Sequence, residues 1–512
     1  MLRRARERKT PWDMVIVGGG ATGIGVAVDA ATRGYGVLLL ERDDFGKGTS
    51  SRSTKLVHGG VRYLGQGNFS LVMEALKERG LLRRNAPHLV ADLAFVVPVY
   101  QWWESPFYGV GLKIYDLLAG RYGFGASKRL SKEETLERLP TLKPEGLRGG
   151  VVYYDGQFDD ARLLVHLART AADHGATLVN HAPVVGLSRD AGGLVDGVVA
   201  RDLESGGELR AGARVVVNAA GAFCDGVRRL ADPNAAPMIA PSQGVHLVFD
   251  RSFLPGDSAI MVPHTKDGRV LFAIPWHGRV VVGTTDTPVE EAAVEPCAFP
   301  HEVDFILETA ANYLARPPRR EDVLSVFTGI RPLVKAGEGS GKNTAALSRD
   351  HTIHIDPSGL LTIAGGKWTT YRNMAEDAVD QAATMAELAE RPCVTRTLRI
   401  HGWREDVETL GHLAVHGADA EAVRAIGRGE RLHERLPYTE AEVVFAARFE
   451  MARRVEDVLA RRTRALPLDA RAAVECAPKV AGILARELRR DAGWERDELA
   501  AFRETAGAYV LG

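Results

Sequence analysis

The feature that most constrains the fold is a glycine-rich turn between a short apolar run and a helical stretch. Residues 14–17 are apolar and mostly β-branched, which predicts a buried parallel strand. Residues 18–23 then satisfy the spacing G-x-G-x-x-G, and apolar side chains at helical spacing follow. A second apolar run at 37–40 ends in Glu41, eighteen residues after Gly23. Strand, glycine turn, helix, strand and acid in this order predict a dinucleotide-binding fold.

Each motif residue has a physical role in such a fold. Gly18 makes the tight turn, Gly20 lets the backbone approach a pyrophosphate, and Gly23 lets the helix pack closely on the strand. The first helical turn, which includes Thr22, faces the phosphates with unpaired N–H groups. Glu41 is placed to accept hydrogen bonds from ribose hydroxyls. We therefore assign these five residues to cofactor binding.

Two later segments indicate which dinucleotide binds. Residues 214–222 and 360–371 each read as a strand that runs into a turn of small residues. Strands that return from so far along the chain resemble the flavoproteins of the glutathione-reductase and D-amino-acid-oxidase type, and this resemblance implies FAD. No second G-x-G-x-x-G follows a strand, so we expect no separate nicotinamide nucleotide site.

With 512 residues the chain fits two or three domains. We expect an α/β architecture with three parts. A Rossmann-like FAD-binding domain is followed by a substrate domain with an antiparallel sheet in 237–290, and an all-helical domain ends the chain. The expected boundaries are 11–95, 150–225 and 345–385 for the FAD-binding domain, 96–149 and 226–344 for the substrate domain, and 390–512 for the helical domain.

Composition excludes several other classes of protein. The net charge of −1 gives no global attraction to nucleic acid. The four cysteines lack C-x-x-C spacing, which argues against a disulfide scaffold, a zinc ribbon or an iron–sulfur cluster and fits a reducing compartment. There is no apolar run of about 18 residues, so we expect no spanning helix. The basic first ten residues lack an apolar core, so we expect no secretory signal there.

A second informative segment lies downstream of the fingerprint, at 48–64. It carries hydroxyl, basic and imidazole side chains, then two glycines and the pair Arg62-Tyr63, whose donors suit a phosphate or a carboxylate. His246, Arg331 and Lys367 lie beside glycine or proline turns elsewhere in the chain. Taken alone, each of these three residues could equally be an ordinary surface or structural residue.

Together these motifs resemble the FAD-dependent glycerol-3-phosphate dehydrogenases, both bacterial and mitochondrial. The likeness extends over almost the full length, including residues 283–287 and 457–464. One departure is Gln243, where some relatives carry a basic residue. No calcium loop of the D-x-[DN]-x-[DN]-G type is present, which separates this chain from the mitochondrial relatives.

The resemblance implies oxidation of sn-glycerol 3-phosphate to dihydroxyacetone phosphate, with hydride transfer to FAD and a membrane quinone as the final acceptor. The complete fingerprint with Glu41, and no obvious tethering motif, predict that the FAD is bound non-covalently. It implies that Arg62, Tyr63 and Lys367 bind the substrate phosphate. His246 is the expected general base and Arg331 is expected to stabilise charge at the C2 oxygen, although these two roles could be exchanged. No metal is expected. Further cofactor contacts are expected from Thr49, Ser50, Ser53, Lys55, His58, Gly60, Val184, Ala220, Gly221, Gly366, Lys367, Trp368 and Thr369.

Residues 102–124 combine aromatic, basic and apolar side chains, as interfacial membrane segments do. We expect a cytoplasmic protein attached peripherally to the inner face of the membrane; packing of these rings at a domain interface is the alternative. The oligomeric state stays open, with a homodimer among the options. Alternative functions are a peroxide-forming glycerol-3-phosphate oxidase, another flavin-dependent hydroxy- or amino-acid oxidase, and a non-catalytic flavin-binding protein.

Overall fold

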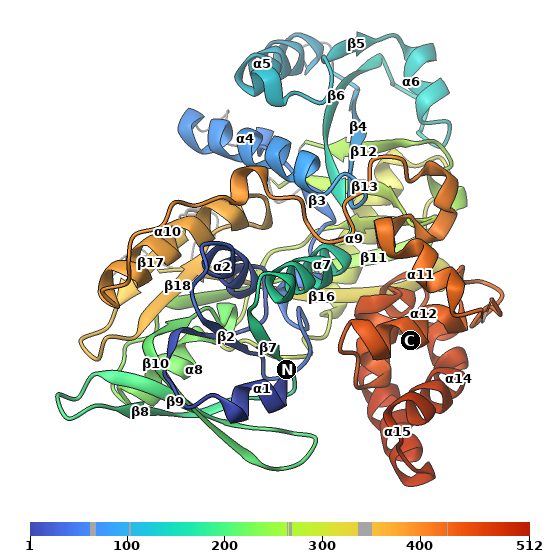
Figure 1. Cartoon of the computed structure of the whole chain (residues 1–512). Helices are drawn as coiled ribbons and strands as arrows, with labels where there is room; N and C mark the ends of the chain where they lie inside the picture. Colours follow the sequence, from blue (N-terminus) through green and yellow to red (C-terminus); the bar gives the residue numbers. More distant parts are fainter. Residues whose placement is uncertain are drawn as a thin grey trace.

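The structure is a computed structural model that describes residues 1–61, 68–101, 104–263, 265, 269–335, 351–427 and 429–511. Two sheets lie beside a group of C-terminal helices (Figure 1). The expected α/β fold, with a largely antiparallel second sheet and a helical C-terminal part, is confirmed.

The first sheet is built on the strands that flank the glycine turn. From edge to edge its main path runs β17 (His351–Ile355), β18 (Leu361–Gly365), β10 (Glu208–Asn218), β1 (Trp12–Val17), β2 (Val37–Leu40) and β7 (Thr177–Val179). Neighbouring strands from β18 to β7 are parallel, and β17 pairs with β18 in the antiparallel sense. Burial on both faces explains why these strands read as uninterrupted apolar runs.

Different layers cover the two faces of this sheet. Met14 and Ile16 of β1 pack in the core beneath the helices α2 (Ala21–Thr32), α7 (Asp160–Asp173) and α10 (Tyr371–Met385). Val15 and Val17 point the other way, as alternation along a strand requires. Their core includes an antiparallel meander formed by β8 (Val184–Arg189), β9 (Val195–Arg201) and the outer part of β10.

The second sheet is mostly antiparallel. Its main path runs β15 (Thr287–Pro288), β11 (Ile239–Asp250), β14 (Arg279–Gly283), β13 (Leu271–Trp276), β12 (Ser258–Val262), β4 (Val90–Val99), β6 (Gly149–Phe158) and β3 (Leu56–Val57). β16 (Val323–Val334) pairs with β11, and β5 (Lys128–Leu130) pairs with β6. β4 and β6 fall partly within the pieces expected for the FAD-binding domain but run in this second sheet, so the domain boundaries stay a proposal.

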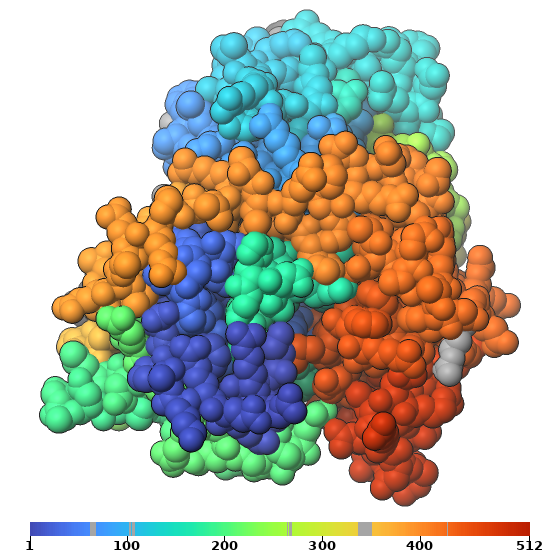
Figure 2. Space-filling model, in the orientation of Figure 1, coloured from blue at the N-terminus to red at the C-terminus, as the bar shows by residue number. Residues whose placement is uncertain are grey.

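Helices cover both faces of the second sheet. α9 (Pro300–Tyr313) packs on one face, and the C-terminal helices pack on the other. The expected helix start at Thr439 is confirmed. Thr439 is the N-cap residue, and its backbone N–H donates to the Glu442 carboxylate at 2.7 Å. In Figure 2 the segment after α10 crosses the face of the molecule to reach these helices. The C-terminal helices are α11 (Ala420–Ala425), α12 (Glu440–Phe449), the π-helical turn Asp457–Arg462, α13 (Ala465–Leu468), α14 (Ala470–Leu488) and α15 (Ala492–Gly507).

Most of the segment expected at the membrane, 102–124, forms an amphipathic helix, α5 (Glu104–Ala119). Tyr108 and Tyr115 are buried, and the Tyr115 hydroxyl donates to Asp155 at 2.7 Å, so these two rings pack in the core and are not available to a membrane. The opposite face of α5 is exposed. Trp102, Trp103 and the side chain of Phe107 lie outside the described residues. Within the described ranges, no helix has the length and apolar character needed to cross a membrane.

The glycine turn holds α2 tightly against β1. Gly18 has φ = 113°, and a Cβ there would lie 2.6 Å from the carbonyl oxygen of Ala219. A Cβ on Gly23 would lie 1.9 Å from the carbonyl oxygen of Gly18. Both neighbours are backbone atoms that cannot rotate away, so only glycine fits at either position.

We predict that Gly23→Ala destabilises the apoprotein by about 1–3 kcal/mol, because α2 must move off the strand, and that it lowers flavin content. Urea unfolding and the bound flavin per chain measure the two effects. Gly482→Ala in α14 is the control, because the nearest atoms to its new Cβ lie at 3.9 Å. The control should be neutral or stabilised by up to about 1 kcal/mol. Equal behaviour of both variants would contradict the packing argument.

Candidate active site

A large cavity opens where β1, β10 and β18 end. It begins at the fingerprint, passes the loop after β2 and reaches the turn after β18. Its lining includes Gly18, Gly20, Thr22, Glu41, Lys47, Thr49, Ser50, Ala220, Gly221, Pro332, Gly366, Lys367, Trp368 and Met374. A second cavity shares Gly18, Glu41 and Ala220 with it and includes Val184. The expected cofactor residues among these therefore line two cavities that share part of their walls.

The polar groups at the fingerprint suit a dinucleotide. The Ser50 hydroxyl accepts from the backbone N–H of Ala21, the first residue of α2, at 2.9 Å. The Glu41 carboxylate accepts from the N–H of Gly19 at 2.6 Å and from the N–H of Asp43 at 2.8 Å. Burial nevertheless outweighs these two hydrogen bonds and raises the pKa of Glu41. The positive end of α2 thus faces the cavity, as binding of a pyrophosphate requires.

The other end of the cavity joins the late glycine turn to the loop after β2. The Trp368 indole Nε1–H donates to the carbonyl oxygen of Ser50 at 2.8 Å. Gly366 has φ = 73°, and a Cβ there would lie 2.4 Å from Met374 Sδ. Residues 368–370 then form a 3₁₀ turn, and helix α10 follows directly from Tyr371. A cavity with a helix terminus at the pyrophosphate end and a second glycine turn at the other end fits FAD.

Some of the expected cofactor residues do not line this cavity. Ser53 and Lys55 instead bind the Asp160 carboxylate, and Lys55 has 0% exposure. His58 donates its backbone N–H to the Thr369 hydroxyl at 3.2 Å. Gly60 follows with φ = 77°. The side chains of Ser53 and Lys55 therefore attach the loop to Asp160 on its buried side, and their direct contact with the cofactor stays a prediction.

His246 lies on β11, buried at 2% exposure. Its Nε2 is 2.9 Å from the Thr54 hydroxyl, and its ring stacks on Phe327 with centroids 4.7 Å apart. Its Nδ1 is buried without a hydrogen-bond partner among the described residues. Burial, and then the charges of Lys55 and Arg331, lower the pKa of His246 well below its usual value. The imidazole is therefore neutral and can accept a proton.

Arg331 lies on β16, beside β11. Its guanidinium donates to the backbone oxygen of Thr285 at 2.9 Å and to the Asp286 carboxylate at 3.2 Å. These contacts hold it at the edge of the site. The next residue, Pro332, lines the cavity, and the Thr49 hydroxyl bonds the backbone oxygen of Ile330. Arg331 therefore lies next to the cofactor cavity.

The expected phosphate-binding residues are only partly described. Lys367 lines the cavity, whereas Arg62 and Tyr63 lie outside the described residues. Gln243, the departure from the family pattern, is buried and donates to the Glu302 carboxylate at 2.7 Å. Its role in this chain is structural.

The sequence analysis did not predict the residues that support the site through hydrogen bonds on its buried side. Thr54, Asp160 and Asp286 contact the predicted site residues His246, Lys55 and Arg331 in that order. Arg464 contacts the backbone oxygen of Ser51, next to the predicted Ser50. Thr54, Asp286 and Arg464 lie in segments that the sequence analysis singled out, but the resemblance gave these residues no role of their own. Asp160 lies outside those segments, and an aspartate at a helix start is common. Their roles depend on contacts between distant segments.

The comparisons with known proteins agree with the interpretation of this cavity as an FAD site. A family model described as FAD dependent oxidoreductase matches residues 13–372, so fold and site define a flavin-dependent oxidoreductase. A second model, described as the C-terminal domain of alpha-glycerophosphate oxidase, matches residues 360–497.

Individual relatives narrow the class further. The mitochondrial glycerol-3-phosphate dehydrogenase SDP6 of Arabidopsis thaliana is 43% identical over 96% of this chain and 86% of its own length. The human mitochondrial glycerol-3-phosphate dehydrogenase is 40% identical over 97% of this chain and 73% of its own length. The crystal structure of the Bacillus halodurans glycerol-3-phosphate dehydrogenase, complexed with FAD, is 29% identical with a TM-score of 0.80, over 99% of this chain and 97% of that one. The chain belongs to the FAD-dependent glycerol-3-phosphate dehydrogenase family.

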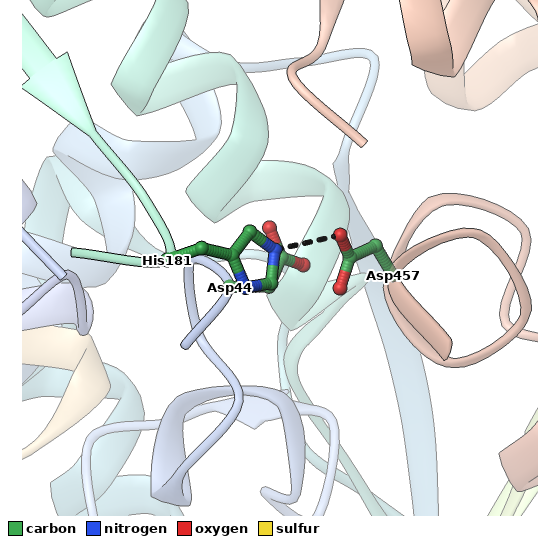
Figure 3. A group of neighbouring side chains, drawn as sticks. All are labelled: Asp44, His181 and Asp457. Carbon is green, nitrogen blue, oxygen red and sulfur yellow. Dashed lines mark hydrogen bonds and ion pairs between the residues drawn. The ribbon is translucent and has the colours of Figure 1, made fainter. Parts of the chain in front are cut away.

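One further cluster has the composition of a metal site. Asp44, His181 and Asp457 lie together and are all buried (Figure 3). However, Arg461 and Arg462 donate to the Asp44 carboxylate at 2.5–2.8 Å, and Arg461 also donates to Asp457 at 2.9 Å. Burial opposes ionisation of Asp44, but Arg462 and Arg461 outweigh it and hold the pKa of Asp44 well below its usual range. A cation here would face two guanidiniums, so we interpret the cluster as an ion-pair network.

The pH dependence of stability tests this interpretation. Burial opposes the charge of His181, but Asp457, which accepts a hydrogen bond from His181 at 3.0 Å, and Asp44 raise the pKa of His181 above its usual value. A raised pKa stabilises the fold fully below the unfolded value of about 6.5, and this stabilisation is lost as pH rises through the folded value. We predict that His181→Asn, which suits the left-handed backbone here (φ = 52°), costs most stability below pH ~6.5 and progressively less above it.

Urea unfolding of the wild type and the variant across this pH range measures the difference. The control is His354→Asn, because this ring lies on the surface, 44% exposed, beside Asp356. Its effect should be small throughout, as for exposed ion pairs. A stability cost at His181 that does not vary with pH would contradict a charged histidine in the network.

Proposed function

We propose that this chain oxidises sn-glycerol 3-phosphate to dihydroxyacetone phosphate, with FAD as hydride acceptor and a membrane quinone as the oxidant of the reduced cofactor. The observation that supports the proposal is a cavity that fits FAD in a chain of this family, with Arg331 next to that cavity and His246 in contact with Thr54 of the loop that lines it. The substrate named in the relatives has a hydroxyl to oxidise and a dianionic phosphate to hold.

Bound FAD supplies the acceptor for the hydride that leaves C2. The residues of the chain bind the substrate and move its proton. We assign the phosphate to Lys367, with Arg62 and Tyr63 as its partners, because a dianion needs more than one cationic or hydroxyl donor. Arg331, oriented by Asp286 and by the backbone oxygen of Thr285, stabilises negative charge that develops on the C2 oxygen.

We assign the general base to His246. A neutral imidazole accepts the C2 hydroxyl proton through a ring nitrogen, and Nδ1 has no hydrogen-bond partner among the described residues. The same burial and neighbouring cations that keep the ring neutral disfavour the imidazolium. The substrate brings a phosphate dianion, which offsets those cations in the complex. Proton transfer to His246 should therefore be easier with a phosphorylated substrate than with an uncharged alcohol.

We predict that His246→Ala slows anaerobic reduction of bound FAD by glycerol 3-phosphate by about 10²–10⁴-fold, with a smaller effect on substrate affinity. Rapid mixing that follows loss of the oxidised flavin absorbance measures both quantities. Glycerol should reduce the wild type poorly, because it cannot occupy the phosphate site. Near-wild-type reduction by the variant would move the base role to another group, and equal reduction by glycerol would contradict the proposed substrate.

Membrane attachment is proposed to use the exposed face of α5 together with the neighbouring helix α4 (Phe69–Asn85) (Figure 1). The docking patch consists of exposed apolar side chains, of which Leu117 is 81% exposed. Its residues are Phe69, Met73, Val110, Ile114 and Leu117. The exposed Lys113 on the same helix can interact with anionic lipid. Apolar side chains on a surface helix can bury at the headgroup boundary and keep the protein near its quinone on the cytoplasmic side.

We predict that replacing Val110, Ile114 and Leu117 by Ser releases the protein from vesicles of mixed neutral and anionic lipid. Each side chain loses up to about 1.5–3 kcal/mol of burial. Quinone reduction should fall, while anaerobic flavin reduction stays intact. Sedimentation with vesicles provides the measurement.

The control replaces Val185, Leu194 and Leu203 by Ser, because these side chains are similarly exposed around the meander of β8 and β9. Vesicle binding should be unchanged in this control. Unchanged sedimentation of the α5 variant would rule out this patch as the attachment site.

A second candidate function is a peroxide-forming oxidase of the same substrate. The match of residues 360–497 to the C-terminal domain of alpha-glycerophosphate oxidase motivates it. Stoichiometric hydrogen peroxide, formed with product in the absence of quinone, would favour the oxidase. Slow reoxidation in air and fast reoxidation by a quinone analogue would favour the dehydrogenase.

A further inference from the structure

The loop between β2 and β3 carries part of the cofactor cavity. Lys47, Thr49 and Ser50 line that cavity, and Ser50 contacts both ends of it, through the N–H of Ala21 and the indole of Trp368. The conformation of this loop therefore decides whether the two ends are correctly spaced for FAD.

The buried side of the loop is held by a residue from the C-terminal part of the chain. Arg464 is 2% exposed, and its Nη2 donates to the backbone oxygen of Ser51 at 2.9 Å and to Asp160 Oδ1 at 2.9 Å. Lys55 reinforces both contacts, because its Nζ donates to the same Ser51 oxygen at 2.8 Å and to Asp160 Oδ2 at 2.7 Å. Ser53 completes the loop's attachment to Asp160 through its N–H and its hydroxyl, at 3.1 and 2.6 Å.

The start of the loop is attached to the same C-terminal segment. Glu456 accepts from Lys47, itself a cavity residue, at 2.8 Å. Arg461 and Arg462 donate to Asp44. The segment 456–464 thus contacts the loop at two places. One is Lys47, whose side chain lines the cofactor cavity, and the other is Ser51, next to Ser50.

We propose that Arg464 is a positioning residue for the cofactor: by holding the Ser51 carbonyl it sets Ser50 and the neighbouring turn in the conformation that binds FAD. A guanidinium suits this task because it carries several donors: Nη2 reaches the Ser51 carbonyl and the Asp160 carboxylate, while Nη1 donates to the backbone oxygen of Ala460 at 2.8 Å and so ties the loop to the C-terminal segment. The inference rests on FAD as cofactor and is independent of the substrate assigned above.

The test compares Arg464→Met and Arg464→Lys with the wild type. The dissociation constant of FAD for the apoprotein is measured by quenching of flavin fluorescence, and urea unfolding of the apoprotein is measured in parallel. We expect Arg464→Met to weaken FAD binding by about tenfold or more, as for loss of a charge-assisted hydrogen bond, with Arg464→Lys intermediate. If Arg464→Met does not fold, the FAD affinity of Arg464→Lys alone tests the proposal: weaker binding than in the wild type supports it, and unchanged binding overturns it.

The matched control is Arg162→Met. Arg162 is equally buried and joins α7 to the C-terminal part through Glu450, at 2.7 and 2.9 Å, but its hydrogen bonds do not go to the loop. This variant should lose stability while FAD affinity stays within about twofold of the wild type. Wild-type FAD affinity in both Arg464 variants would overturn the proposal. So would an equal loss of affinity in the Arg162 variant, because the effect would then come from domain packing alone.

If glycerol 3-phosphate failed to reduce the flavin of the wild type, the proposed function would fail while this titration would still be decisive. Conversely, normal reduction kinetics with unchanged FAD affinity in both Arg464 variants would overturn the positioning role alone.

Discussion

One buried carboxylate, that of Asp160, joins three parts of the molecule. It lies in the first turn of α7 and accepts hydrogen bonds from Ser53, Lys55 and Arg464. Removal of the carboxylate would leave Lys55 and Arg464 in the interior without the partner they share, and breaking a buried pair typically costs about 3–5 kcal/mol. The helix terminus adds favourable potential for the same carboxylate. The first sheet, the cofactor loop and the C-terminal helices meet at this residue, so their mutual arrangement depends on it.

The same loop connects cofactor chemistry to substrate chemistry. At one end Ser50 contacts the first turn of α2, and at the other the Thr54 hydroxyl contacts His246. Lys55, one residue further, lies 4.8 Å from the centroid of Phe327, the ring on which His246 stacks. Burial lowers the pKa of this lysine to about 7, even though Asp160 opposes the shift. The electrostatics of the imidazole and the conformation of the loop therefore depend on the same few buried groups.

Local sequence signals gave specific predictions for the cofactor half of the site. The fingerprint, Glu41 and the late glycine turn are set by backbone geometry that only certain residues satisfy, and such requirements can be recognised in a sequence. The packing of Ser53 and Lys55 could not be predicted in this way, because hydroxyl and amine groups serve equally well for a ligand or for a buried aspartate. Tyr115 shows the same limit: an aromatic residue on an amphipathic helix suits a membrane, yet its hydroxyl is bound by Asp155 inside the protein. The hydrogen-bond partner of a polar side chain is often on a segment far away in the sequence. A single sequence does not show which distant segments come into contact.

The separation between Asp160 and Arg464 has a consequence for biosynthesis. The two residues are 304 positions apart, and Arg461 follows Asp44 by 417. During translation the strands of the first sheet that lie early in the chain can pair while these acids still lack their guanidinium partners. Domains formed early in synthesis usually fold first, but here the contacts of the cofactor loop are complete only after the segment 456–464 has left the ribosome. If Arg464 positions the loop as proposed, the nascent chain reaches its full affinity for flavin only after most of its length has been made.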